Sequence, residues 1–346
     1  MMPGMFAPGD LEHPIVGAPL AGGPTTIALA AAVSNAGGLG FLAAGYKTAD
    51  AVREDVAAMR TATDRPFGVN VFVPAGEPAS AGVVAAYAGR LRAAGLETGD
   101  PRWDDDDWAA KCELLLAERP PVASFTFGLP PRRLIADLQE AGVAVWITVT
   151  TPHEATTAAQ AGADALICQG AEAGGHRGGL EPANPGDYGV LALLQIAGAA
   201  VPLPLIAAGG IVTGAGVAGV LAAGAAAAAL GTALMRTPEA GTVGAHREAL
   251  AYDSPTALTR AFTGRSARGI VNAFMRDHGD AAPVAYPELH HLTSPARAAA
   301  RAAGDPDGFN LWAGQAHALA TEEPAADLVR RLAAEARQRL AAAATR

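Results

Sequence analysis

The chain has 346 residues, of which 50% are hydrophobic and 17% charged, so it can bury a large core and is not broadly disordered. Its formal net charge of −9 argues against a general nucleic-acid binder, which would need a basic surface. Two cysteines, Cys112 and Cys168, exclude a disulfide scaffold and a cysteine-rich zinc site.

Eight short apolar runs, most of them bounded by Gly or Pro, recur between longer Ala-rich segments. The runs are continuous rather than alternating, which is typical of parallel strands that are covered on both faces. We predict strands at residues 14–19, 38–43, 67–73, 121–127, 143–149, 163–168, 203–208 and 226–231.

The spacing of these runs predicts an α/β fold of the TIM (β/α)8 barrel type. Most runs start about 20 to 30 residues apart, which is the length of one strand, one loop and one helix. Two intervals are longer, and they contain the acidic segment DPRWDDDDW (100–108) and the glycine-rich segment QGAEAGGHRGG (169–179). Extra length at the carboxyl ends of barrel strands commonly builds the active site.

We assign the barrel to residues 1–240 and predict that residues 241–346 form a mostly helical C-terminal extension covering the active site. The segment from residue 322 onward is expected to be an amphipathic surface helix. Residues 211–235 carry no charge, but Ala and Gly dominate them, so we interpret them as a buried helix and strand. No secretory signal is visible at the N-terminus, and a cytoplasmic protein without membrane contact is expected.

Glycines follow the last two predicted strands, where TIM barrels place a phosphate site. From this placement we expect Gly209, Gly210, Gly231 and Thr232 to bind a phosphate through backbone N–H groups. The loop after the sixth strand surrounds His176 with glycines, which permit close backbone approach to a ligand. His176 is therefore a candidate catalytic residue, although a loop histidine can simply satisfy a backbone carbonyl.

Several separate motifs, in order, resemble the nitronate monooxygenases (2-nitropropane dioxygenases), particularly their first class. The resemblance covers roughly residues 14–315, without the acidic insertion and the last helix. Its motifs include GVNVFVP (68–74), SFTFGLP (124–130), the glycine-rich loop, AFTGRSARGIVN (261–272) and NLWAGQ (310–315).

The resemblance implies a barrel that binds FMN non-covalently and oxidises alkyl nitronates, such as propionate 3-nitronate, with molecular oxygen. It implies that Asn70 and Gln169 bind the polar edge of the flavin and that His176 is the active-site histidine. Leu20 stands where the family usually has methionine, a change of little expected consequence. The residues implied to contact the cofactor are Ala18, Pro19, Leu20, Ala21, Asn70, Gln169, Gly174, Gly175, Gly209, Gly210, Gly231 and Thr232.

The partners implied are a small nitronate and O2, with no nucleic acid and no metal, in a monomer or homodimer. His176 could hold the nitronate by a hydrogen bond or act as a general base on a neutral nitroalkane. Two alternatives stay open: an NADH:quinone or enoyl-thioester reductase on the same barrel, and a phosphate-binding barrel without a redox role.

Other features have simpler interpretations. The aspartates 104–107 are expected to be a solvated charge run rather than a metal site. His290 and His291 lack ligand partners at helical spacing. We expect Glu172 to order the glycine-rich loop, and Trp312 to pack the extension on the barrel rather than to line the pocket. Gln169 could also be a satisfied amide at the barrel rim.

Overall fold

A computed structural model of the protein describes residues 5–74 and 76–345, and it confirms the predicted barrel. The eight parallel strands lie in the order β1-β9-β8-β6-β5-β4-β3-β2, and a parallel bridge between Val16 and Leu39 joins the first strand to the last. The strands are β1 (Ile15–Gly17), β2 (Gly40–Ala43), β3 (Phe67–Phe72), β4 (Val122–Thr126), β5 (Ala144–Val149), β6 (Ala165–Gln169), β8 (Leu205–Ala208) and β9 (Ala227–Leu230).

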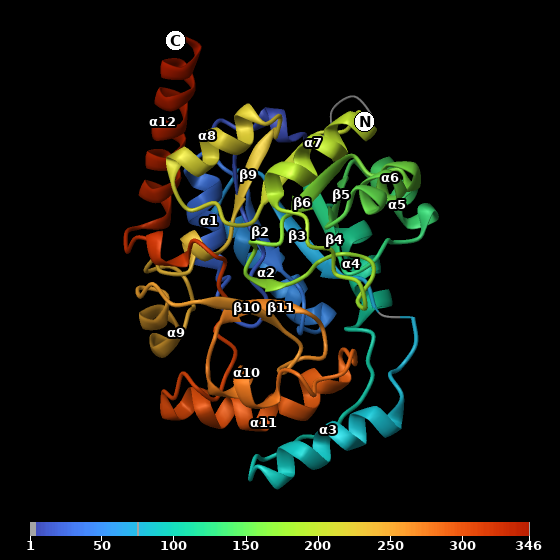
Figure 1. Ribbon diagram of the computed structural model, residues 1–346. Helices are drawn as coiled ribbons and strands as arrows, with labels where there is room; N and C mark the ends of the chain where they lie inside the picture. Colours follow the sequence, from blue (N-terminus) through green and yellow to red (C-terminus); the bar gives the residue numbers. More distant parts are fainter. Residues whose placement is uncertain (1–4, 75, 346) are drawn as a thin grey trace.

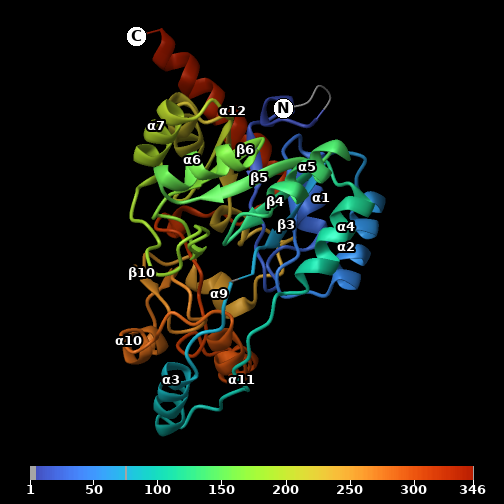
Figure 2. The same cartoon turned by 90° about the vertical axis from the view of Figure 1, so that its right-hand side faces the viewer.

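Helices follow the strands and cover the outside of the barrel (Figures 1 and 2). They are α1 (Ile27–Asn35), α2 (Ala49–Ala62), α4 (Trp108–Glu118), α5 (Arg132–Glu140), α6 (Pro152–Ala161), α7 (Val190–Ala200) and α8 (Gly214–Ala222). Threonine side chains at Thr26, Thr48, Thr151 and Thr213 cap α1, α2, α6 and α8 by accepting a backbone N–H from the first turn.

Two apolar layers hold the barrel together. Inside the barrel, Trp146 is fully buried, and its ring centroid lies 5.9 Å from that of Phe41. Together with Val16, Leu39 and Ile206, these rings form the inner core. The second layer lies between strands and helices, where α1 lies so close to β2 that a Cβ at Gly40 would lie 2.0 Å from the Ala30 carbonyl oxygen. Glycine is therefore required at that crossing.

The extension contains both helices and strands. Its elements are α9 (Gly244–Ala249), β10 (Thr256–Thr259), β11 (Ala267–Ile270), α10 (Ala273–His278) and α11 (Glu288–Ala303). The β10–β11 hairpin was not predicted, and β11 pairs antiparallel with β7 (Gly175–His176) from the glycine-rich loop. A helix inside the first long interval, α3 (Ala81–Ala93), packs beside α11 at the side of the molecule away from the barrel (Figures 1 and 2).

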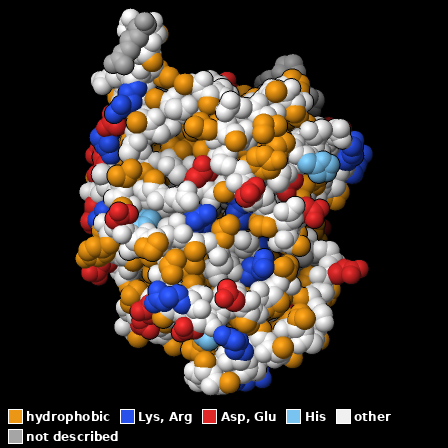
Figure 3. Space-filling view, viewed as in Figure 1, with side chains coloured by type: hydrophobic (Ala, Val, Ile, Leu, Met, Phe, Trp, Pro, Cys, Tyr) orange, Lys and Arg blue, Asp and Glu red, His pale blue; other side chains and the backbone are white. Residues whose placement is uncertain are grey.

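The last helix, α12 (Ala325–Ala344), returns to the barrel. It was expected to be an amphipathic surface helix, and it packs against α8 and α1, where its buried Leu328, Val329 and Leu332 join the outer core. It thereby fills the position of an eighth barrel helix, and residues 241–324 are inserted before it. No helix among the described residues has the length and apolar character needed to cross a membrane. Acidic and basic side chains are interspersed over the face in Figure 3.

Candidate active site

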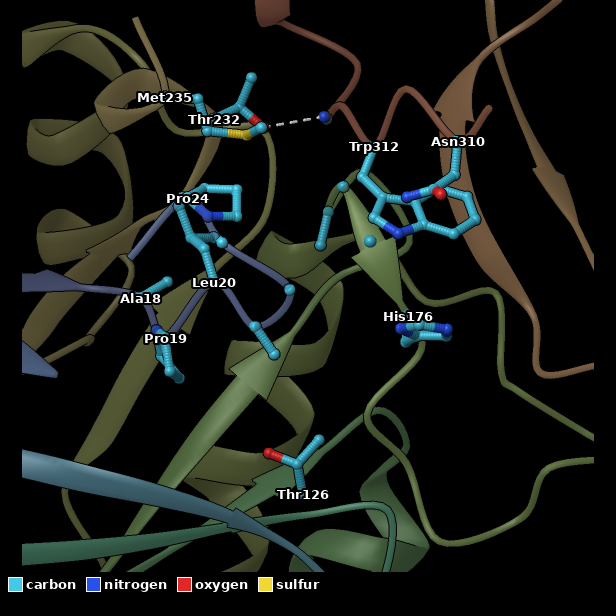
Figure 4. A pocket seen from close by; sticks show the side chains of 18 of the residues that line it. Ala18, Pro19, Leu20, Pro24, Thr126, His176, Thr232, Met235, Asn310 and Trp312 are labelled. Atoms are coloured by element: carbon cyan, nitrogen blue, oxygen red, sulfur yellow. Dashed lines mark hydrogen bonds between the residues drawn. The ribbon is translucent and has the colours of Figure 1, made fainter. Parts of the chain in front are cut away.

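A cavity of about 630 Å³ lies between the carboxyl ends of the barrel strands and the extension. Figure 4 shows the loop after β1 on one side of it and His176, Asn310 and Trp312 on the other. None of the described residues that line the cavity is an Asp or a Glu, whereas two arginines, Arg297 and Arg301, do line it. The cavity is therefore suited to an anionic ligand.

All the site residues expected from the sequence line this one cavity. They come from the carboxyl ends of five barrel strands, β1, β3, β6, β8 and β9, or from the loops that follow them. The residues are Ala18, Pro19, Leu20, Ala21, Asn70, Gln169, Gly174, Gly175, His176, Gly209, Gly210, Gly231 and Thr232. Their proximity is a structural finding, and their individual roles stay predictions.

The loop after β1 forms an apolar wall of the cavity. The Leu20 backbone N–H donates to the Thr25 hydroxyl at 2.8 Å, and the Thr25 N–H donates back to the Leu20 carbonyl at 3.2 Å. These two bonds close the loop on itself, so the side chains of Ala18, Pro19 and Leu20 are held toward the cavity (Figure 4). A flat apolar group could pack against this wall.

The ends of β8 and β9 offer backbone donors to the cavity. Gly209 and Gly210 have φ values of +118° and +68°, a conformation that side-chain-bearing residues rarely adopt. In the described chain, the N–H groups of Gly209, Gly210, Gly231 and Thr232 donate no hydrogen bond to protein. The Thr232 hydroxyl accepts from the Gly314 N–H at 3.0 Å, which attaches the extension at this edge (Figure 4).

Asn70 is held by two residues of the SFTFGLP motif, whose roles the sequence did not reveal. Its Nδ2 donates to the Ser124 hydroxyl at 2.9 Å and to the Thr126 hydroxyl at 3.0 Å. Asn70 is 2% exposed, and these bonds fix the orientation of its amide. The next residue, Phe127, has a φ of +79° and places its ring 5.7 Å from that of His176.

The glycine-rich loop is ordered by its own polar side chains. Both Glu172 carboxylate oxygens accept the Val190 N–H at 3.0 Å, which ties the loop to the start of α7. Gln169 donates to the His176 carbonyl at 3.0 Å and accepts the Gly178 N–H at 2.8 Å. These bonds favour the reading of Gln169 as an amide that orders the loop.

His176 lies at the centre of an aromatic and cationic environment. Its Nε2 is 2.9 Å from the Thr263 hydroxyl, and the Trp312 ring centroid is 5.5 Å from its own. Burial, together with the guanidinium groups of Arg265 and Arg297, lowers the pKa of His176 to about 3. The imidazole is therefore neutral at physiological pH in the absence of an anionic ligand.

The extension contributes residues that were not expected at the site from the sequence. Oδ1 of Asn310 accepts hydrogen bonds from Arg297 at 3.2 Å and from Arg301 at 2.8 Å. In the described part of the chain neither guanidinium forms an ion pair with a carboxylate, and burial together with Arg301 lowers the pKa of Arg297 to about 10. Their spacing of four residues on a helix could have indicated a shared face.

One interpretation made from the sequence needs correction at the cavity wall. Trp312 lines the cavity and also packs 5.5 Å from Phe262, so it does more than join the extension to the barrel. His290 lines the cavity as well, stacked on Tyr46, while His291 pairs with Asp104 at 2.5 Å.

The acidic run is solvated only in part, since Asp107 is exposed whereas Asp106 is partly buried. Asp106 accepts the Tyr46 N–H at 2.8 Å and pairs with the fully buried Lys111 at 2.8 Å. Asp107 accepts the Ala49 N–H at 2.7 Å, at the start of α2. The expectation was wrong for Asp106, because its carboxylate accepts a backbone N–H of the loop after β2 and thereby fixes Tyr46 at the cavity.

Comparisons with known proteins agree on one family. The family model described as nitronate monooxygenase matches residues 10–335. A nitronate monooxygenase from Pseudomonas aeruginosa is 42% identical, covering 94% of this chain and 97% of its own length. A probable nitronate monooxygenase from Bacillus subtilis is 36% identical, covering 91% of this chain and 93% of its own.

Solved structures with the same architecture include a nitroalkane oxidase from Streptomyces ansochromogenes. It is 50% identical, with a TM-score of 0.92 and coverage of 98% of each chain. FabK from Thermotoga maritima is 28% identical, with a TM-score of 0.77, covering 97% of this chain and 96% of its own.

Proposed function

This chain belongs to the nitronate monooxygenase family and is an oxidoreductase, and on that premise we propose that it binds FMN and oxidises alkyl nitronates with O2 to a carbonyl product and nitrite. The observation that carries the proposal is the composition of the cavity. It places a neutral His176 and two arginines around a space without a lining carboxylate, opposite an apolar wall. A nitronate is an anion and FMN carries an anionic phosphate, so both suit this site.

The residues present fit the cofactor. The wall formed by Ala18, Pro19 and Leu20 is apolar and suits a flat ring system. The free N–H groups at Gly209, Gly210, Gly231 and Thr232 would hold the phosphate, with no carboxylate of the cavity lining to repel it. Asn70 and Gln169 line the same cavity. When bound, the flavin supplies the redox chemistry that these side chains lack.

The chain's own residues bind and orient the nitronate. The guanidinium groups of Arg265 and Arg297 lie close enough to lower the pKa of His176, and the same positive field stabilises a delocalised anion beside the imidazole. The rings of Phe127 and Trp312 flank His176 and exclude water from it. The positive field and the exclusion of water together favour binding of the substrate anion in the cavity over its remaining in bulk water.

A second negative group on the substrate would find a partner at Arg301. Arg297 and Arg301 share one neutral acceptor, Asn310, and among the described residues that line the cavity no carboxylate balances their two positive charges. Such a pair suits a carboxylate, and propionate 3-nitronate carries one at the end of a short chain.

The test starts with the visible spectrum of the purified protein, which would show the bound flavin, followed by oxygen uptake on adding ethyl nitronate. Uptake with formation of nitrite supports the proposal. Anaerobic bleaching by NADH, with no oxygen uptake on nitronates, would instead support the reductase alternative. A protein that stays colourless after FMN is added would support a barrel without a redox role.

A further inference from the structure

Thr263, from the loop between β10 and β11, makes the polar contact to the His176 ring. Its hydroxyl oxygen lies 2.9 Å from Nε2 of His176, 3.3 Å from the Arg265 carbonyl oxygen and 3.5 Å from the Arg265 backbone nitrogen. Thr263 lines the cavity, whereas Arg265 is 3% exposed and does not, so water does not compete for the Arg265 carbonyl. Counting donors and acceptors therefore decides how the hydroxyl proton is placed.

Two arrangements are conceivable. In the first, the hydroxyl donates to the Arg265 carbonyl and accepts from a protonated Nε2 of His176. In the second, the hydroxyl donates to an unprotonated Nε2. The second arrangement leaves the Arg265 carbonyl with no donor among the described residues, because Thr263 is the donor that reaches it. A buried carbonyl without a partner is costly, and the first arrangement is preferred on the order of tenfold.

The position of the remaining ring nitrogen follows from this count. Nδ1 of His176 makes no hydrogen bond to any residue in the described ranges, and the ring lines the cavity. With the proton on Nε2, a neutral imidazole presents a lone pair at Nδ1. Burial and the two nearby arginines keep the pKa of the imidazole low, so it is neutral in the empty site.

We propose that Thr263 is a positioning residue that holds His176 in the Nε2–H tautomer, so that Nδ1 carries the lone pair which a general base toward neutral nitroalkanes needs. This inference rests on the proposed function and on His176 as the general base. In that step, Nδ1 removes the proton from the carbon that bears the nitro group. The C–H electron pair stays on the substrate and is delocalised into the nitro group, giving a nitronate beside an imidazolium.

The experiment compares fresh nitroethane with ethyl nitronate as substrates of the flavin-loaded enzyme. In Thr263→Val the side chain keeps its size but can neither accept from Nε2 nor donate to Arg265. We expect turnover of nitroethane to fall about tenfold or more, while turnover of ethyl nitronate stays within about threefold, because the general-base step is needed for the neutral substrate alone. Thr263→Ser restores the ratio, since serine keeps the hydroxyl.

A matched control separates this role from a loss of packing. Thr237 is also fully buried, and its hydroxyl donates to the Leu234 carbonyl at 2.9 Å away from His176. Thr237→Val therefore should leave the ratio of the two substrates unchanged. If Thr263→Val and Thr237→Val change the ratio equally, Thr263 has no special role.

A second readout does not depend on activity. In protein labelled with ¹⁵N-histidine, the ring signals that disappear in His176→Asn identify His176, and their shifts distinguish the two tautomers. We expect Nε2–H in the wild type and in Thr263→Ser, even if Thr263→Val does not fold. A wild-type ring protonated at Nδ1, or a wild type that oxidises ethyl nitronate but not nitroethane, overturns the inference and leaves the proposed function intact. Failure with ethyl nitronate itself would instead remove the proposed function.

Discussion

Tyr46 and His290 stack face to face, with ring centroids 4.2 Å apart and an interplanar angle of 2°. The pair joins a barrel loop to α11 and separates the main cavity from a second one of about 330 Å³, since both rings line both cavities. The Tyr46 hydroxyl is also 3.2 Å from that of Tyr286. The stacked rings thus form a wall that limits how far a substrate can extend.

The first prediction removes this wall. His290→Ala should join the two cavities and raise kcat/KM for a bulky nitronate relative to ethyl nitronate by roughly tenfold, the scale of one apolar pocket contact. Tyr46→Phe keeps the stack and removes the hydroxyl, so it serves as the control with an unchanged ratio. Oxygen uptake with linear and branched nitronates measures the effect, and an unchanged preference in His290→Ala would show that the wall does not limit substrate size.

The second prediction concerns His176 itself. His176→Asn should retain the flavin spectrum, because no residue expected to hold the phosphate is altered, while turnover of nitroethane falls by about 10²-fold, the usual loss for a general base. His153 on α6 is exposed, and His153→Asn is the matched control with unchanged turnover. Turnover of His176→Asn at the wild-type level would remove His176 from the mechanism.

The third prediction tests the paired arginines. Arg301→Gln should raise KM for propionate 3-nitronate by about tenfold or more, as expected for one charged hydrogen bond, and leave KM for ethyl nitronate nearly unchanged. Arg330 lies exposed on α12, so Arg330→Gln removes a charge away from the cavity and controls for general electrostatics. Equal changes in KM for both substrates would mean that Arg301 does not contact a carboxylate.

The fourth prediction uses two adjacent glycines in the loop. A Cβ at Gly174 would lie 2.5 Å from the Ala313 carbonyl carbon and from the Gly314 nitrogen, which are backbone atoms that cannot move aside easily. Gly175 has a φ of +75° but no atom within 4 Å of an added Cβ. Gly174→Ala should therefore lower the free energy of unfolding by about 3 kcal/mol and Gly175→Ala by about 1 kcal/mol. Urea unfolding measures both, and equal losses would show that contact with the extension is loose.

The fifth prediction concerns pH. His246 is 6% exposed, and burial lowers its pKa to about 4 even though Nε2 contacts the Trp312 carbonyl at 3.0 Å. As the pH is lowered, His246 gains a proton near pH 6.5 in the unfolded chain but only near pH 4 in the folded chain. The free energy of unfolding therefore decreases as the pH falls from about 6.5 to about 4, and His246 does not affect it above this range.

Urea unfolding at pH 7.5, 6.5 and 5.0 tests this effect. Between pH 6.5 and 5.0, His246→Gln should lose about 1.5 kcal/mol less stability than the wild type, because it has no proton to gain there. The exposed His153→Gln should follow the wild type. Parallel pH curves for the wild type and His246→Gln would show that His246 titrates equally in both states.

The barrel could be predicted because its strands are continuous apolar runs, and the loop residues at strand ends then had to share one rim. The half of the cavity that the extension builds could not be predicted from the sequence. The strands Thr256–Thr259 and Ala267–Ile270 are short and contain polar residues, so no period indicates them, although β11 pairs with the strand that carries His176. In the sequence, Arg297 and Arg301 are indistinguishable from arginines on a solvated helix face. Only the fold shows that both donate to Asn310. The division at residue 240 and the cytoplasmic location stay predictions.

The position of α12 has a consequence for how the chain is made. The groove between α8 and α1 is apolar, and Ala325–Ala344 covers it after more than a hundred other residues have followed α8. During synthesis this groove stays open while the hairpin and α11 are already emerging. The outer layer of the barrel is thus completed only when α12 has been made. A nascent chain stalled before residue 325 would expose this apolar groove to chaperones.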